Sequence, residues 1–182
     1  MNTGRHYQLW YFALAILLVV SGCSQSTSDR NHYSIDNKYA SEIDRQTFSV
    51  SIPRGWTEDT ADDMYDPETF VFFENPESCM FSVMIGEKST GITIDDILLN
   101  QKAVWEEKLT NCDVMRLTKW ATREAKGFEI KGKMFGMLRS VCRMYGFDND
   151  TRVCVVMEFA VSSDFKKYAA DFEKIRQTFR LK

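Results

Sequence analysis

Alternating apolar and polar residues predict a domain rich in β-strands over residues 46–182. Phe48, Val50 and Ile52 alternate with polar residues, which is the pattern of a strand with one buried face. The same reasoning predicts further strands over residues 69–74, 79–86, 114–120 and 152–161. Short polar segments between several of these strands indicate hairpin loops.

An unusually long strand is expected over residues 128–145, with a bulge or bend marked by Gly132 and Gly136, and it is paired with the last strand. Setting Cys142 opposite Val155 brings the apolar faces of the two strands together. It also places Arg139 opposite Glu158, which is a favourable cross-strand pair. A slip of one residue would break both arrangements, so this register is the prediction.

Two segments carry apolar residues at helical spacing. The first begins after Thr93, which can cap the helix together with Asp96 three residues on. Its apolar stripe consists of Ile94, Ile97, Leu98, Trp105 and Leu109. The second is predicted over residues 164–178, with Ser163 as its cap and a strong apolar face. Each helix is therefore expected to lie on a sheet.

The N-terminus has the order of a secretory signal: a basic residue, an apolar core and small residues before a cleavage point. Arg5 precedes an uncharged apolar run that ends in Val20-Ser21-Gly22-Cys23. These four residues resemble the lipobox of bacterial lipoproteins. A membrane-spanning helix is the rival, but it needs about 20 apolar residues, and this run is shorter. An ordinary cleaved signal with an incidental cysteine is the other alternative.

The lipobox resemblance implies that the Cys23 thiol receives a diacylglyceryl group and that cleavage falls between Gly22 and Cys23. The new amine could then be acylated, and two or more acyl chains anchor a protein stably without a spanning segment. Ser24 follows the cysteine, where an Asp would favour retention at the inner membrane of a Gram-negative cell. The outer membrane is thus the favoured location in such a cell.

The predicted organisation is a signal peptide over 1–22, the lipidated cysteine and a flexible tether over 23–45, and one domain over 46–182. The tether is rich in Ser, Asn and Asp and lacks apolar periodicity. The alternative is that Tyr33, Ile35 and Tyr39 dock on the domain as an extra strand.

The segment from Phe48 to Trp56 resembles the opening strand of PsbP-like domains, because it combines apolar alternation with a Pro-x-x-Trp turn. The mid-chain helix and the ending from Ile175 to Phe179 fit the same family. The resemblance implies an α+β fold, an α/β/α sandwich with helices packed on both faces of an antiparallel sheet. Its known members share protein binding and assembly rather than a catalytic set, so no functional residue is carried over.

Composition narrows the chemistry further. The formal net charge is −3, which argues against a nucleic-acid partner. The two histidines, His6 and His32, precede the predicted domain. Because histidine is the commonest general acid–base and metal ligand, its absence from the domain argues against Ser-His-Asp and Cys-His catalysis and most zinc enzymes. We therefore expect no catalytic residue, metal or cofactor.

An acidic segment over residues 58–68 leaves two other hypotheses open. Carboxylates suit calcium, but no EF-hand loop pattern is present, and a solvated acidic loop is the plainer interpretation. A small hydrolase that uses Asp62, Asp63 or Asp66 is the alternative function, and it requires these groups to meet in a pocket with raised pKa values.

Four cysteines remain after Cys23, namely Cys79, Cys112, Cys142 and Cys154. An exported compartment permits disulfides. The predicted register places Cys142 and Cys154 on opposite faces of the sheet, which leaves a Cys79–Cys112 bond or free buried thiols. No C-x-x-C pair indicates a zinc site. Together the sequence predicts a lipid-anchored, non-catalytic module of the cell envelope that contacts the membrane through Cys23 and binds an unidentified protein partner.

Overall fold

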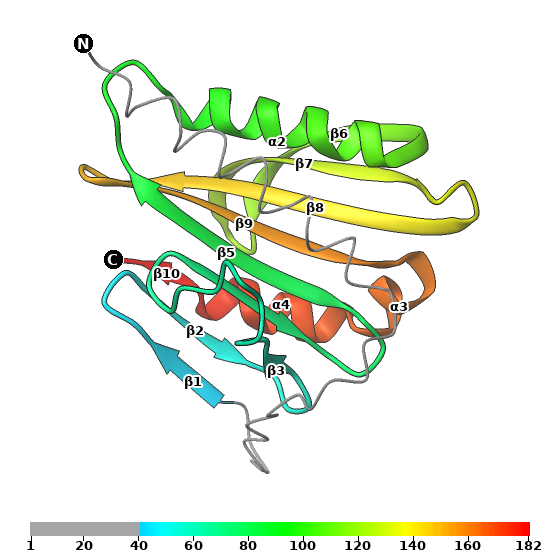
Figure 1. The fold of residues 1–182 in the computed structure, drawn as a ribbon, viewed down its shortest axis with the longest axis horizontal. Helices are drawn as coiled ribbons and strands as arrows, with labels where there is room; N and C mark the ends of the chain where they lie inside the picture. The colour runs from blue at the N-terminus through cyan, green and yellow to red at the C-terminus, as the bar shows by residue number, and fades with distance from the viewer. Residues whose placement is uncertain (1–40) are drawn as a thin grey trace. The chain divides into compact units, whose positions relative to one another are not determined.

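The computed structural model describes residues 41–182, and these residues form two antiparallel sheets with three helices (Figure 1). The strands are β1 (Ser41–Asp44), β2 (Phe48–Ile52), β3 (Thr57–Glu58), β4 (Phe70–Glu74), β5 (Met80–Glu87), β6 (Leu109–Trp120), β7 (Arg123–Met134), β8 (Leu138–Asp148), β9 (Arg152–Val161) and β10 (Arg180–Leu181). The helices are α2 (Ile94–Lys108), α3 (Ser162–Lys167) and α4 (Ala169–Thr178).

The large sheet has seven strands in the order β3-β4-β5-β9-β8-β7-β6, and every neighbouring pair is antiparallel. The small sheet has the order β1-β2-β10, so the last strand of the chain pairs with the second. Because β1 lies within the segment expected to be a tether, the folded domain includes at least four residues more than the sequence indicated. The rest of the expected tether lies outside the described residues.

Helices cover both faces of the large sheet. On one face, Trp105 of α2 stacks on Phe159 of β9 with ring centroids 5.2 Å apart. The helix lies close to β8 because Gly146 has no side chain, and a Cβ there would come within 2.5 Å of Ile94. On the other face, α3 and α4 supply the buried residues Phe165 and Phe172. The α+β fold with helices on both faces of an antiparallel sheet is confirmed.

An aromatic cluster joins the two sheets beneath α4. Phe179 stacks on Phe48 of the small sheet at 6.1 Å. It also contacts Trp120 and Phe147 of the large sheet, at 6.0 and 5.7 Å. Among the described residues, the buried hydrophobic core runs from Phe48 to Phe179 and draws on both sheets and on both α3 and α4.

The single long strand expected over 128–145 is wrong, because the chain turns back at Phe135 and Gly136 to form β7 and β8. Met137 N–H donates to Met134 O at 3.1 Å, and both central residues have positive φ, 51° and 72°. Two positive φ angles are typical of a tight hairpin turn. Hairpin loops are usually marked by polar residues, and the residues on either side of this turn are apolar. The sequence therefore did not indicate a hairpin here.

The predicted register of the last hairpin is also wrong. Cys142 lies opposite Phe159 rather than Val155, a shift of four residues. Glu158 therefore pairs across the strands with Arg143, while Arg139 lies opposite Lys133 of β7. A shift by an even number keeps every side chain on its predicted face, so hydrophobic pattern alone does not distinguish the two registers.

The expected capping of α2 is confirmed, but that of the last helix is not. Thr93 Oγ1 accepts from Asp96 N–H at 3.2 Å, and Thr93 N–H donates to the Asp96 carboxylate at 2.9 Å. The C-terminal helix is divided at Tyr168 into α3 and α4. Because α3 follows β9 directly, its N-cap position is Val161 and Ser163 is an exposed residue inside the helix.

Candidate functional site

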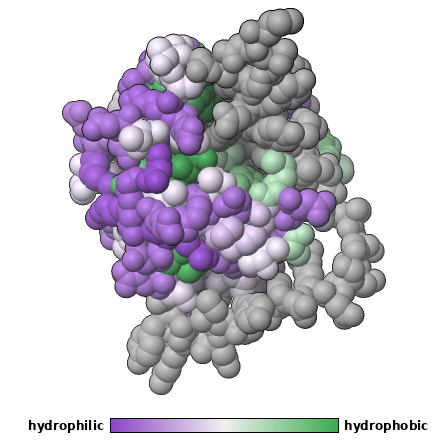
Figure 2. Space-filling model, turned by 60° about the vertical axis from the view of Figure 1, so that its left-hand side comes forward, coloured by the Kyte–Doolittle hydropathy of each residue, from purple (hydrophilic) through white to green (hydrophobic). Residues whose placement is uncertain are grey.

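The loops at one end of the large sheet form the concave surface that we consider as the candidate site. A hollow of about 370 Å³ lies between the β5–α2 loop and the β8–β9 loop, and we call it the loop-end hollow. It is lined by Lys88, Ser89, Thr90, Gly91, Ile92, Thr93 and Asp150. Figure 2 turns this end toward the viewer and shows mostly hydrophilic residues, with small hydrophobic areas between them.

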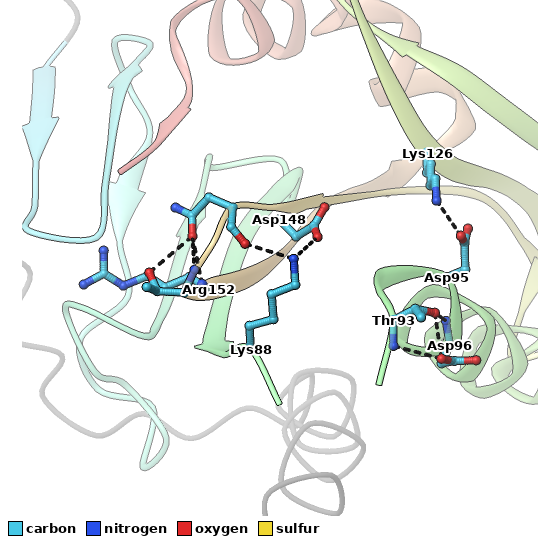
Figure 3. Close-up of polar contacts among 9 residues, drawn as sticks. Lys88, Thr93, Asp95, Asp96, Lys126, Asp148 and Arg152 are labelled. Atoms are coloured by element: carbon cyan, nitrogen blue, oxygen red, sulfur yellow. Dashed lines mark hydrogen bonds and ion pairs between the residues drawn. The ribbon is translucent and has the colours of Figure 1, made fainter. Parts of the chain in front are cut away.

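Lys88 connects the two loops across the hollow (Figure 3). Its Nζ donates to Asp148 Oδ2 at 2.7 Å and to Asn149 O at 3.1 Å. The backbone N–H of Lys88 donates to Thr151 O at 2.8 Å, so main chain and side chain hold the same loop. Lys88 and Asp148 are exposed, and an exposed pair of this kind contributes about 1 kcal/mol or less.

Asn149 organises the β8–β9 loop from within. Its Oδ1 accepts from the backbone N–H groups of Thr151 and Arg152, at 3.0 and 2.8 Å. Its Nδ2 donates to Lys182 O at 3.0 Å, and Arg152 Nη1 donates to the same oxygen at 2.8 Å. The loop is thereby tied to the last residue of the chain, beside the small sheet.

The start of α2 forms the other wall of the hollow. Asp95 pairs with Lys126 of β7, while Asp96 completes the capping box with Thr93 (Figure 3). The side chains of Lys88, Asp95, Asp96, Lys126 and Asp148 thus each have a partner in the chain, and Asp150 also lines the hollow. The hollow is therefore bordered by charges of both signs.

In the acidic segment, some carboxylates accept from their own backbone, whereas Glu58 pairs with Arg45 and Glu68 accepts from Thr47 N–H. Asp62 accepts from Met64 N–H at 2.7 Å, and Asp66 accepts from Glu68 N–H at 2.8 Å, while Asp63 is exposed. Across residues 41–182, no group of three or more His, Cys, Asp or Glu side chains is placed to hold a metal ion. Neither the calcium site nor the hydrolase alternative gains support from this arrangement.

All four domain cysteines are free thiols. Cys79, Cys142 and Cys154 are buried, and burial raises the pKa of Cys79 to about 11. Cys112 is half-buried, and its thiol donates to Leu109 O at 2.9 Å. Of the two outcomes that the sequence left open, the structure has free thiols rather than a Cys79–Cys112 bond.

A buried ion pair lies under α4. Arg176 Nη1 donates to both carboxylate oxygens of Glu158, at 2.6 and 2.8 Å, and Glu158 is completely buried. Burial raises the pKa of Glu158 to about 7, although Arg176 and Arg143 lower it. Because Arg176 closes over the carboxylate, we interpret the pair as structural.

A second ionic cluster lies beside this pair on the same sheet face. Glu129 accepts from Arg143 Nε at 2.6 Å and also pairs with Lys131. Arg143 stacks over the ring of Phe165, 4.6 Å from its centroid. Sequence reasoning missed both clusters, since the cross-strand Arg143–Glu158 contact emerges only from the correct register.

The predicted lipobox, Val20-Ser21-Gly22-Cys23, lies outside the described residues. From Ser41 onward, no helix is long and apolar enough to cross a membrane.

Neither a protein-family model nor a curated protein matches the sequence. The structure is similar to the solution structure of cyanobacterial PsbP (CyanoP) from Synechocystis sp. PCC 6803, with a TM-score of 0.54 and 11% identity over 88% of this chain and 100% of that one. It is also similar to LpqN, involved in cell envelope biogenesis of Mycobacterium tuberculosis (TM-score 0.52, 9% identity, 84% and 99% covered). The Saccharomyces cerevisiae Ran-binding protein Mog1p gives a TM-score of 0.51 at 10% identity, with 78% and 95% covered.

These likenesses, together with the antiparallel sheet between helices, show that the domain has the PsbP/Mog1-like fold. At such low identity they establish the fold alone, and a role has to be argued from this chain's own residues.

Proposed function

We propose that this chain is a bacterial lipoprotein, fastened to a membrane of the cell envelope through lipid on Cys23, whose domain is a non-catalytic protein-binding or assembly module. The observation that carries the proposal is the order of Arg5, the apolar run and Val20-Ser21-Gly22-Cys23. Ser24 favours the outer membrane if the cell is Gram-negative.

The binding role is supported by the fold and by the candidate site. Among the proteins of similar fold, Mog1p is named as Ran-binding and LpqN as involved in cell envelope biogenesis. In this chain, the side chains of Lys88, Asn149 and Arg152 hold the loop-end hollow in a fixed shape. A preorganised surface lowers the entropic cost of binding a partner.

Replacing Cys23 by alanine is expected to abolish lipidation and to lower the membrane-bound fraction of the protein about tenfold or more, because no acyl chain remains to hold it. The measurement is fractionation of cells that express the full chain, with the protein quantified in membrane and supernatant. Cys112→Ala is the matched control, since it removes a half-buried thiol far along the chain and is expected to leave the fractions unchanged.

A membrane fraction and a mass that are both unchanged in Cys23→Ala, apart from the substitution itself, would contradict the anchor. The partner is sought by affinity capture of the anchored wild-type protein from membranes, followed by mass spectrometry. Recovery of no reproducible partner would count against the binding module while leaving the anchor intact.

A further inference from the structure

The β7–β8 hairpin ends in an apolar tip that no other part of the described chain covers. Phe135 is 63% exposed, Met137 79% and Leu138 50%. In Figure 1 this hairpin projects at the right-hand end of the domain, at the end opposite to β10 and the C-terminus. A convex tip differs from a groove, because its side chains leave water only when the tip itself enters a lipid bilayer or a cavity of a partner.

The backbone at the tip is unfavourable for the residue that occupies it. Phe135 has a φ of 51°, a conformation that Gly, Asn and Asp adopt far more readily than an aromatic residue. Its exposed ring gains little packing in return. Strained residues that persist without a structural benefit point to a functional constraint.

Both strands carry cations next to the tip, although Lys131 is paired with Glu129 on the same face and lies opposite Asp113 of β6. From residue 130 to residue 142 the chain contains Lys131, Lys133 and Arg139 and no acidic residue. Strand pairing sets Lys133 opposite Arg139 and Lys131 opposite Val141, so the three cations lie on one face of the hairpin. The neighbouring end of α2 adds Glu107 and Lys108, whose charges are opposite in sign.

We propose that the β7–β8 hairpin tip inserts into the interface of an anionic lipid bilayer, with Phe135, Met137 and Leu138 among the acyl chains and Lys133 and Arg139 against the headgroups. Apolar side chains at the tip of a basic element are the combination that binds anionic membrane surfaces. Each basic residue near such a surface adds to the attraction. The proposal does not depend on lipid at Cys23.

The test uses residues 24–182, which lack the predicted signal and Cys23 and keep every residue that the structure describes, and a Phe135→Trp reporter. Trp56, Trp105 and Trp120 are buried, so the reporter is the exposed indole among the described residues. We expect its emission to shift to shorter wavelength, and to be quenched by brominated lipid, on vesicles of phosphatidylcholine with phosphatidylglycerol. Vesicles of phosphatidylcholine alone are expected to give a far smaller shift.

Two sets of variants test the apolar and the basic residues of the hairpin tip separately, and vesicle sedimentation measures their binding. Phe135→Asn with Met137→Ser is expected to lower the partition coefficient on anionic vesicles about tenfold or more. Lys133→Gln and Arg139→Gln are each expected to lower it about fivefold, an effect that added salt removes. Leu99→Ser with Met115→Ser is the matched control, because both residues are about half exposed elsewhere, at 53% and 51%, and it is expected to bind as wild type.

Absence of a shift on anionic vesicles would overturn the proposal. So would binding that survives loss of Phe135 and Met137, or a concentration-dependent dimer that the same double variant abolishes in the absence of lipid. None of these outcomes bears on lipidation of Cys23, which the fractionation experiment tests separately.

Discussion

Replacing Arg176 by methionine is expected to destabilise the domain by about 3–5 kcal/mol near pH 8, because it leaves a buried carboxylate without its partner. Arg176 makes two hydrogen bonds to Glu158, which is fully buried beneath α4. Near pH 5 the loss is expected to be smaller. Burial raises the pKa of Glu158 to about 7, so at pH 5 the group is protonated and needs no counter-charge.

The sign of the wild-type pH dependence follows from the same pKa. The folded value, about 7, lies above the ordinary value of 4.5, so the folded state holds a proton that the unfolded state has released. The contribution of Glu158 to stability is therefore complete below about pH 4.5 and is lost as the pH rises through 7. Glu158→Gln is expected to remove this part of the pH dependence.

Urea unfolding at both pH values measures these effects. The control is Glu173→Gln, which removes the more exposed partner of Arg176 and is expected to cost about 1 kcal/mol or less. The double variant Arg176→Met with Glu158→Leu is expected to recover most of the lost stability. Equal losses near pH 5 and pH 8 would show that packing of the Arg176 side chain, rather than the charge of Glu158, causes the loss.

Truncating Phe179 to alanine is expected to cost about 3–5 kcal/mol, because it opens a cavity at the contact between the two sheets. The ring is 1% exposed and packs on Phe48, Trp120 and Phe147. We also expect β10, which follows Phe179 directly, to lose protection of its amides against hydrogen exchange before the large sheet does.

Phe135→Ala is the matched control, since it removes the same side chain from a position that is 63% exposed. Its effect on the free energy of unfolding is expected to lie within about 0.5 kcal/mol of zero. Thermal and urea unfolding of the two variants give the comparison. Similar losses for both would refute the assignment of Phe179 to the contact between the sheets.

Several elements could be predicted from the sequence because their hydrophobic pattern and the residues that bound it indicate the same start and end. β9 was predicted at residues 152–161, and it occupies that range because its alternation is bounded by a polar loop before it. The capping box of Thr93 and Asp96 fixes the start of α2 in the same local way. The residues that define β9 and the start of α2 lie within a few positions of one another, so both can be predicted without knowledge of long-range contacts.

The errors arise where local pattern does not distinguish the alternatives. The turn at Phe135 and Gly136 has an aromatic residue where Asn or Gly is usual, so Gly136 alone indicated a bend rather than a hairpin turn. Arg139 and Arg143 lie on the same face of β8, and either could be set opposite Glu158. The choice between them depends on where the turn lies.

The candidate site could not be predicted, since its contacts join residues far apart in sequence. Lys88 meets Asp148 across 60 positions, and Asn149 meets Lys182 across 33. Asn149 begins an Asn-x-Thr pattern that says nothing of this contact, and the other residues belong to no motif. The composition of the acidic segment suggested a metal or catalytic site. In the structure, the carboxylates of Asp62 and Asp66 accept from neighbouring backbone and Glu58 pairs with Arg45, which composition does not reveal.

The mass of the N-terminal peptide of the mature protein, purified from membranes of the cells that make it, tests the central claim most directly. The account predicts a peptide that begins at Cys23 and is heavier than its sequence by a diacylglyceryl group and, where the amine is acylated, by one further acyl chain. A mature chain that begins at another residue, or one that begins at Cys23 with the unmodified mass, would contradict it.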